Sequence, residues 1–203
     1  MEIAVMADIH GNYVAFERCM EYCRQRGIDT YIFLGDYAGE MAFPEKAMEM
    51  LFKIKEKYRC YFVRGNKEDY WKNYRDKGET GWKEYDSTTG SLYYTYYHLS
   101  QKSMDFSDKS MDWTIMKDFA VKYAFISLPY DVERVIRDLH EAGLDKYAPC
   151  WCQITEYLLR KGDVSHGRVL NRAMELCKEK VGDCIWPNIP EEYWCQAVKE
   201  MIG

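Results

Sequence analysis

The sequence predicts an α/β fold, with a parallel sheet in the first third of the chain and an all-helical C-terminal extension. Two observations lead to this prediction. Short apolar runs that end abruptly in polar residues are typical of buried parallel strands. Amphipathic segments separate these runs, which is the order of successive right-handed crossover units. We therefore expect a first domain over residues 1–130 and a helical extension over residues 131–203.

Three runs in the first domain are predicted to be strands, and the two segments between them are predicted to be helices. The strands are Ile3–Ala7, Tyr31–Leu34 and Cys60–Val63. The first helix is Tyr13–Arg26, and it is closed by Gly27, a residue favoured just past a helix C-terminus. The second helix begins at Pro44, because proline is favoured in a first helical turn, and extends to about Lys57.

The segment Tyr70–Tyr97 is rich in Tyr and Trp and surrounds a polar turn at Asp86–Gly90. Two interpretations compete. The segment could form helices whose half-buried aromatic side chains pack over the edge of the sheet. Alternatively, it could form an aromatic wall that stacks a nucleobase or an aromatic leaving group. We favour the first interpretation, because aromatic residues at helical spacing usually face a core.

The rest of the chain contains one more predicted strand and then helices. Phe119–Leu128 is rich in residues that favour strands. Gly143, Gly162 and Gly182 indicate helix ends, and Ser165 indicates a helix start. The predicted helices are Val132–Ala142, Ile154–Lys161, a segment from Ser165 to about Lys180, and a last one from Pro190 to Met201.

The composition is that of a globular protein, with 203 residues of which 47% are hydrophobic and 30% charged. The net charge is -5, with both signs interspersed, so we expect no binding to nucleic acid backbones. Small phosphorylated substrates are compatible with this charge, because a bound metal supplies positive charge locally. The sequence has no apolar run of about 18 residues and no secretion signal, so we predict a cytoplasmic protein without a membrane span.

The 8 cysteines are expected to be reduced thiols, because disulfides are rare in the cytoplasm. An alternative is a zinc site formed by Cys150, Cys152, Cys177 and Cys184. Their spacing fits no standard zinc pattern, however. We therefore favour the interpretation that these cysteines are buried free thiols.

Each predicted strand of the first third ends in residues that can bind a metal. Ligands of open parallel sheets bind at the carboxyl ends of the strands, and Asp8, His10, Asp36 and Asn66 lie there. Asp8 and His10, two residues apart on an extended chain, point the same way and can bind one cation. Asp36 can bridge to a second cation, to which Asn66 offers its amide oxygen. Mixed N/O ligation suits Mn, Fe, Zn or Co, and two such cations can activate a water and clamp phosphoryl oxygens.

The sequence resembles the calcineurin-like metallophosphoesterase family, most closely its small bacterial phosphodiesterase branch. The motifs are Asp8-x-His10-Gly11-Asn12, Gly35-Asp36 and Gly65-Asn66-Lys67-Glu68. The resemblance covers residues 1 to about 70, and Phe119–Asp131 is similar to the last strand of such domains. It implies a β-sandwich flanked by helices and two divalent metal ions, with Asp8 and His10 on the first, Asp36 bridging and Asn66 on the second. It also implies hydrolysis of phosphomonoesters or phosphodiesters by a metal-activated water.

Two features depart from the family pattern. The third motif of the family usually contains a histidine that helps to protonate the leaving group, and Lys67 stands at that place. We count Lys67 with Asp36 and Asn66 as candidate catalytic residues; its ammonium either contacts a phosphate or is solvated. The later His-Gly and Gly-His-x-His motifs of the family are also lacking. We infer that a block of the domain is missing between about residues 105 and 118.

The histidines that follow the third motif are His98, His140 and His166, and we expect a structural role for each. Because the block between about residues 105 and 118 is missing, the sandwich would be incomplete. Without the later histidine motifs, four ligands would have to bind two cations and would bind them weakly. Three hypotheses follow. The protein is a metal-dependent phosphoesterase acting on a small phosphorylated substrate, or it is a catalytically impaired relative that acts as a binding protein or is a degenerate remnant. In the third, a homodimer completes the site with His98 or His166 of a second subunit.

Overall fold

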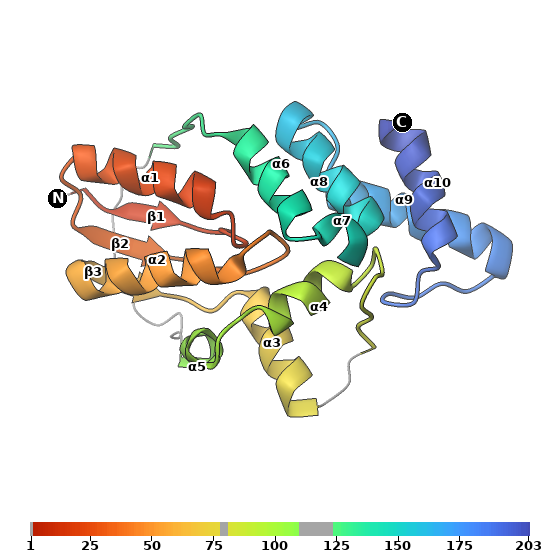
Figure 1. Cartoon of the computed structure of the whole chain (residues 1–203), viewed down its shortest axis with the longest axis horizontal. Helices are drawn as coiled ribbons and strands as arrows, with labels where there is room; N and C mark the ends of the chain where they lie inside the picture. The colour runs from red at the N-terminus through yellow and green to blue at the C-terminus, as the bar shows by residue number, and fades with distance from the viewer. Residues whose placement is uncertain (1, 78–80, 110–123) are drawn as a thin grey trace. The chain divides into compact units, whose positions relative to one another are not determined.

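The computed structural model describes residues 2–77, 81–109 and 124–203 (Figure 1). The chain divides into two compact units. Unit 1 consists of residues 1–39, 43–78 and 98–131, and unit 2 of residues 40–42, 79–97 and 132–203. The C-terminal helices thus share a unit with residues 79–97, which the predicted boundary at residue 130 did not anticipate.

Unit 1 contains a parallel three-stranded sheet with the strand order β1-β2-β3. The strands are β1 (Ala4–Met6), β2 (Thr30–Phe33) and β3 (Arg59–Phe62). Each lies within one residue of the predicted run at either end. In the register, Val5 pairs with Ile32, which in turn pairs with Tyr61. The prediction of a parallel sheet in the first third of the chain is therefore confirmed.

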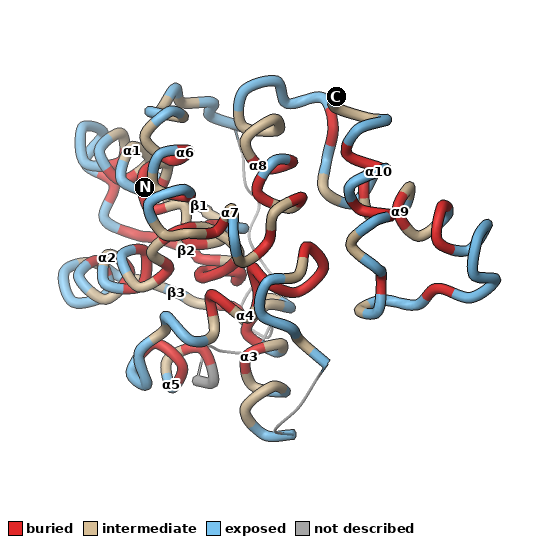
Figure 2. Tube along the Cα trace, turned by 45° about the vertical axis from the view of Figure 1, so that its right-hand side comes forward, coloured by how far each residue is buried: buried red, intermediate tan, exposed pale blue. Residues whose placement is uncertain are grey.

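Two helices, α1 (Tyr13–Gln25) and α2 (Pro44–Lys57), connect the strands and pack against each other. The Asn12 side chain caps α1 by accepting a hydrogen bond from the Ala15 amide at 3.1 Å. Phe16 of α1 contacts Phe33 of β2 edge to face, with ring centroids 6.0 Å apart. Phe33 is fully buried, and burial continues along β2 (Figure 2). The apolar residues of the sheet and of the two helices thus form the core of unit 1.

The other face of the sheet is open in the part of the chain that the structure describes. The paired residues Val5, Ile32 and Tyr61 point to this face, because side chains alternate along a strand. Val5 is 57% exposed and Tyr61 is 40% exposed. A β-sandwich needs a second sheet on this face, and the described residues form one sheet only. The α/β class is confirmed, and the β-sandwich is not.

Unit 1 is completed by α3 (Asn66–Lys77) and α5 (Gln101–Lys109). Phe106 of α5 contacts Phe62 of β3 and Phe52 of α2, at centroid distances of 5.0 and 5.4 Å. Glu45, in the first turn of α2, accepts hydrogen bonds from the Ser100 amide at 3.0 Å and the Ser100 hydroxyl at 2.7 Å. These contacts fix α5 beside β3 and α2.

Unit 2 is all-helical in its described residues. Its helices are α4 (Gly90–Tyr97), α6 (Val132–Glu141), α7 (Leu144–Tyr147), α8 (Pro149–Lys161), α9 (His166–Val181) and α10 (Glu191–Ile202). α8, α9 and α10 share a core in which Ile154 is 0% and Trp194 is 1% exposed. Gly162 ends α8 with a left-handed conformation, and the Ser165 side chain caps α9. Both helix signals were predicted. None of the described helices is long and apolar enough to cross a membrane.

The aromatic segment is divided between the two units. Trp71 of α3 is 1% exposed and Tyr94 of α4 is 2% exposed. Tyr94 and Tyr85 both contact Tyr147, each with ring centroids 5.2 Å apart. The buried aromatic residues therefore lie in helices and pack inside their units, which agrees with the helical part of the first interpretation.

Two sequence predictions need correction. The strand predicted at Phe119–Leu128 is wrong in its described part, because residues 124–131 form neither helix nor strand; residues 119–123 lie outside the described residues. Phe125 is 95% exposed, so the strand-favouring residues here find no sheet to join. The helix predicted to begin at Ile154 begins at Pro149, which occupies its first turn.

Candidate metal centre

The loops that follow β1 and β2 lie side by side. Backbone hydrogen bonds continue between them beyond the strands: the Asp8 amide donates to the Gly35 carbonyl at 3.3 Å, and the His10 amide donates to the Asp36 carbonyl at 2.8 Å. These two bonds fix the first motif against the second. The edge they form is the carboxyl edge of a parallel sheet, where such folds bind ligands.

Asp8, His10 and Asp36 come together at this edge. His10 Nε2 lies 3.4 Å from Asp8 Oδ1 and 3.9 Å from Asp36 Oδ2. One ligand atom from each residue lies within 4.8 Å of the other two. The side chains are 11% exposed for Asp36, 28% for His10 and 70% for Asp8. The cluster therefore opens from a buried carboxylate toward solvent, so that a cation can reach it.

All three residues have a backbone conformation that side chains rarely adopt. Their φ angles are 54° at Asp8, 49° at His10 and 52° at Asp36. Each such conformation costs about 1–3 kcal/mol and persists only where the surrounding structure enforces it. Strain of this kind clusters at functional sites. All three members of the cluster are thus held in an uncommon backbone conformation by the loops around them.

The carboxylate of Glu68 joins the loop after β2 to the loop after β3. It is 1% exposed and accepts hydrogen bonds from the amides of Asp36 (2.9 Å), Tyr37 (3.0 Å) and Gly65 (2.8 Å). Burial raises the pKa of Glu68, and the three amides offset part of this rise. Glu68 is the third residue of α3 and reaches back to the residue that precedes the helix, which is the capping-box arrangement. We did not predict this role, although a Glu three residues after Gly65 was its signal.

Gly35 and Gly65 allow the loops after β2 and β3 to touch. A Cβ atom added at Gly35 would lie closer than 3.0 Å to the Gly65 backbone. A Cβ atom added at Gly65 would lie closer than 3.0 Å to the backbone and carboxylate of Asp36. Real Cβ atoms essentially never come this close. The glycines of the second and third motifs are therefore required by close backbone approach.

Asn66 and Lys67 follow Gly65 in the third motif. Asn66 is the exposed first residue of α3. The Lys67 amide donates a hydrogen bond to Asp36 Oδ1 at 2.9 Å, while the Lys67 ammonium lies 5.4 Å from the ring centroid of Tyr70. Lys67 thus contacts the cluster through its backbone. This contact holds Oδ1 of Asp36, and Oδ2 faces His10.

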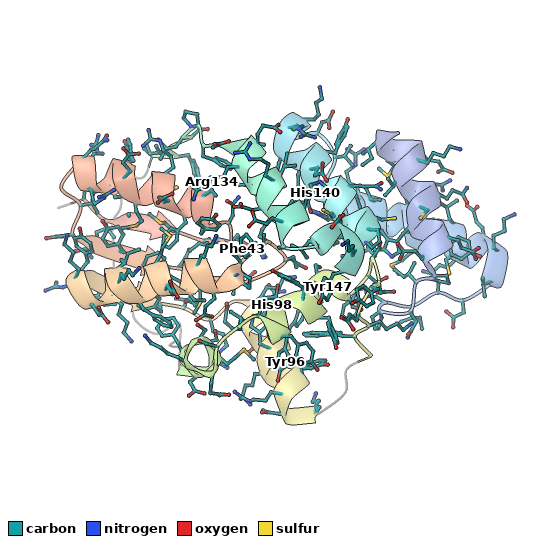
Figure 3. All side chains as sticks on the ribbon, viewed as in Figure 1. Phe43, Tyr96, His98, Arg134, His140 and Tyr147 are labelled. Carbon is teal, nitrogen blue, oxygen red and sulfur yellow. The ribbon has the colours of Figure 1, made fainter. Side chains whose placement is uncertain are left out.

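Two of the three histidines that follow the third motif have side-chain partners outside the cluster, and the third is exposed. His140 Nε2, on α6, lies 2.8 Å from Glu156 Oε1, and His166 Nε2, on α9, lies 2.8 Å from Thr155 Oγ1. These contacts agree with the structural roles predicted for His140 and His166. His98 is exposed and lies between α4 and α5 (Figure 3).

The sequence matches the model of a known protein family. Residues 1–119 match the family model described as calcineurin-like phosphoesterase. The chain belongs to this family. The match contains all three motifs predicted to supply metal ligands, and members of the family typically bind divalent metals. The family resemblance inferred from the motifs is therefore confirmed, and the branch within the family stays a prediction.

A divalent cation fits the cluster of this calcineurin-like phosphoesterase. Asp8 and Asp36 offer carboxylate oxygens and His10 offers an imidazole nitrogen, which is a ligand set that Mn, Fe, Zn and Co accept. A cation would also offset the negative charge of two neighbouring carboxylates. The structure thus brings together three of the four predicted ligands, and the fourth, Asn66, is the first residue of α3, directly after Gly65.

Proposed function

We propose that this protein is a metal-dependent phosphoesterase of the cytoplasm that hydrolyses small phosphodiesters or phosphomonoesters. The observation that carries the proposal is the cluster of Asp8, His10 and Asp36 at the carboxyl edge of the sheet, in a chain of a phosphoesterase family. In this proposal Asp8 and His10 bind a first divalent ion. Asp36 and Asn66 would hold a second ion.

Each residue of the cluster has a distinct part in the proposed reaction. Bound divalent ions would supply charge neutralisation at the phosphoryl oxygens and would lower the pKa of the attacking water. Asp36 is kept in one orientation by the Lys67 amide on Oδ1 and by Glu68 on its own amide. Asp8 is more exposed than His10 and Asp36, so substrate approaches from its side. We assign Lys67 the role of positioning Asp36.

Hydrolysis of bis-p-nitrophenyl phosphate tests the proposal. Wild-type protein loaded with Mn²⁺ should release p-nitrophenol, and Asp36→Asn should abolish this release. Asp36→Asn is a conservative change, because its amide oxygen can still accept from Lys67 at the Oδ1 position. Asp105→Asn, in α5, is the matched control and should retain full activity. Equal turnover in wild type and Asp36→Asn, or no turnover in wild type at any Mn²⁺ concentration, would refute the proposal.

A second candidate function is that of a catalytically impaired family member that binds a phosphorylated ligand without hydrolysing it. The observation that favours it is the engagement of His140 with Glu156 and of His166 with Thr155, since both histidines then have structural partners. Metal binding with no turnover of either phosphomonoester or phosphodiester would support this candidate. Specific activity that rises with protein concentration would instead support a homodimer that completes the site.

A further inference from the structure

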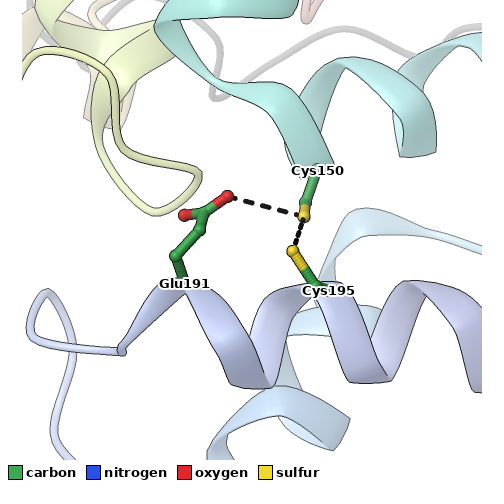
Figure 4. A group of neighbouring side chains, drawn as sticks. All are labelled: Cys150, Glu191 and Cys195. Atoms are coloured by element: carbon green, nitrogen blue, oxygen red, sulfur yellow. Dashed lines mark hydrogen bonds between the residues drawn. The ribbon is translucent and has the colours of Figure 1, made fainter.

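A second group of metal-binding side chains lies in unit 2 and is distinct from the cluster of unit 1. Cys150 Sγ lies 3.5 Å from Cys195 Sγ and 3.5 Å from Glu191 Oε1 (Figure 4). One ligand atom from each of the three residues lies within 4.8 Å of the other two. Cys150 is buried, and Cys195 is exposed. The group therefore extends from the interior of unit 2 to its surface.

The positions of these residues on two helices explain why they converge. Cys150 lies in the first turn of α8, directly after Pro149. Glu191 and Cys195 lie four residues apart on α10, so their side chains project from the same face of the helix. α8 and α10 pack against each other. The packing brings a thiol of one helix against a thiol and a carboxylate of the other.

The sulfur–oxygen distance matches that of a tetrahedral zinc site, and the sulfur–sulfur distance is about 0.3 Å shorter than in such a site. With Zn–S bonds of about 2.3 Å and Zn–O bonds of about 2.0 Å, two sulfur ligands lie about 3.8 Å apart, and a sulfur and an oxygen lie about 3.5 Å apart. The observed separations are 3.5 Å in both cases. A disulfide would need the two sulfur atoms at about 2.05 Å.

Ser87 holds the carboxylate of Glu191 in position. The Ser87 amide donates to Glu191 Oε2 at 3.0 Å, and the Ser87 hydroxyl donates to Glu191 Oε1. The same hydroxyl accepts a hydrogen bond from the Cys150 amide at 2.8 Å. Ser87 is fully buried. Partners that orient a metal ligand in this way are typical of metal sites, where their loss weakens affinity by about 10–100-fold.

We propose that Cys150, Cys195 and Glu191 bind one zinc ion, with a fourth position open to water or to an external ligand. Binding would release the protons of the two thiols to solvent, because thiolates are the ligands of zinc. The ion joins α8 to α10, and it enters from the exposed side of Cys195.

Cobalt(II) binding to the reduced, chelator-treated full-length protein tests this proposal. Thiolate ligands give Co²⁺ a charge-transfer absorption in the near ultraviolet, which the oxygen and nitrogen ligands of Asp8, His10 and Asp36 cannot produce. We expect this absorption to reach a plateau as Co²⁺ is added, although the cluster of Asp8, His10 and Asp36 also takes up part of the Co²⁺, and to disappear when Zn²⁺ is added. Asp36→Asn should leave it unchanged, which separates this site from the proposed phosphoesterase centre.

Three variants locate the ligands. Cys195→Ser, at an exposed position, should lower the charge-transfer intensity by about half, since one of two thiolates is lost, and should weaken Co²⁺ binding at least tenfold. Glu191→Gln and Ser87→Ala should keep the absorption but weaken binding by about 10–100-fold. Cys184→Ser is the control: Cys184 lies beside Cys177 in unit 2 and outside the group, so the absorption should remain.

Several outcomes would overturn the proposal. One is a reduced wild-type protein that shows no charge-transfer absorption with excess Co²⁺. Another is a Cys195→Ser variant with the wild-type absorption, or a Cys184→Ser variant that loses it. A protein that binds no Co²⁺ through sulfur but forms a Cys150–Cys195 disulfide with oxidised glutathione would show a redox pair in place of the metal site.

Discussion

Replacement of Glu68 by alanine should destabilise unit 1, because three amides, two of them buried, lose their common acceptor. The carboxylate of Glu68 accepts from the amides of Asp36, Tyr37 and Gly65, at 2.8–3.0 Å. An unsatisfied buried donor costs about 1–3 kcal/mol. At about 1.5 kcal/mol each, the two buried donors cost about 3 kcal/mol, which is a large part of the stability of a typical domain, about 5–15 kcal/mol. Mn²⁺ binding should weaken as well, since the same bonds position Asp36.

Urea denaturation and hydrogen exchange measure this effect together. We expect Glu68→Ala to lower the free energy of unfolding by about 3 kcal/mol, and the amides of residues 36, 37 and 65 to exchange faster. The matched control is Asp69→Ala, the next residue of α3, whose side chain is 55% exposed and pairs with Arg64 at 3.4 Å. This control should change stability by no more than about 0.5 kcal/mol. A Glu68→Ala protein as stable as Asp69→Ala would refute the reasoning.

Three further predictions concern other parts of the chain. Gly65→Ala should abolish Mn²⁺ binding measured by calorimetry, because the added Cβ displaces Asp36; unchanged affinity would contradict the close contact. Ile154→Ala, at a fully buried position, should lower the free energy of unfolding by about 2–5 kcal/mol, whereas Val181→Ala, at a residue that is 63% exposed, should change it by no more than about 0.5 kcal/mol. Burial raises the pKa of Cys60 from 9.0 to about 11. Alkylation of Cys60 by iodoacetamide at pH 8 should therefore be about a hundredfold slower than that of a model thiol, and should accelerate up to pH 11; a rate equal to that of the model thiol would contradict the shift.

Local sequence patterns were enough to predict the sheet and most helices. A strand followed at once by a polar motif is visible in a few residues, as in the run that ends before Asp8. Helix ends are equally local, because Ser165 caps the helix that follows it and Gly162 ends the one before it. The same locality explains why the carboxyl edge of the sheet could be predicted: once the strands are parallel, their C-terminal residues meet at one edge.

Features that depend on distant contacts could not be predicted. The apolar run that contains Val5 suggested a strand buried on both faces, yet Val5 is 57% exposed, because the described residues provide no second layer on its side. Glu68 satisfies amides of the loop after β2, which is more than 30 residues away along the chain. The pairing of Cys150 with Cys195 depends on the packing of α8 against α10. None of these relations leaves a periodic signal in the sequence.

Binding of Mn²⁺ to the wild-type protein and to Asp36→Asn tests the central claim most directly. Asp36 is the most buried member of the cluster, and the variant keeps the oxygen that accepts from the Lys67 amide, so its fold should persist. Calorimetry of the metal-free protein should show Mn²⁺ binding in the wild type and a loss of at least tenfold in affinity in Asp36→Asn. Equal Mn²⁺ affinity in the two proteins would show that Asp8, His10 and Asp36 are not the metal centre.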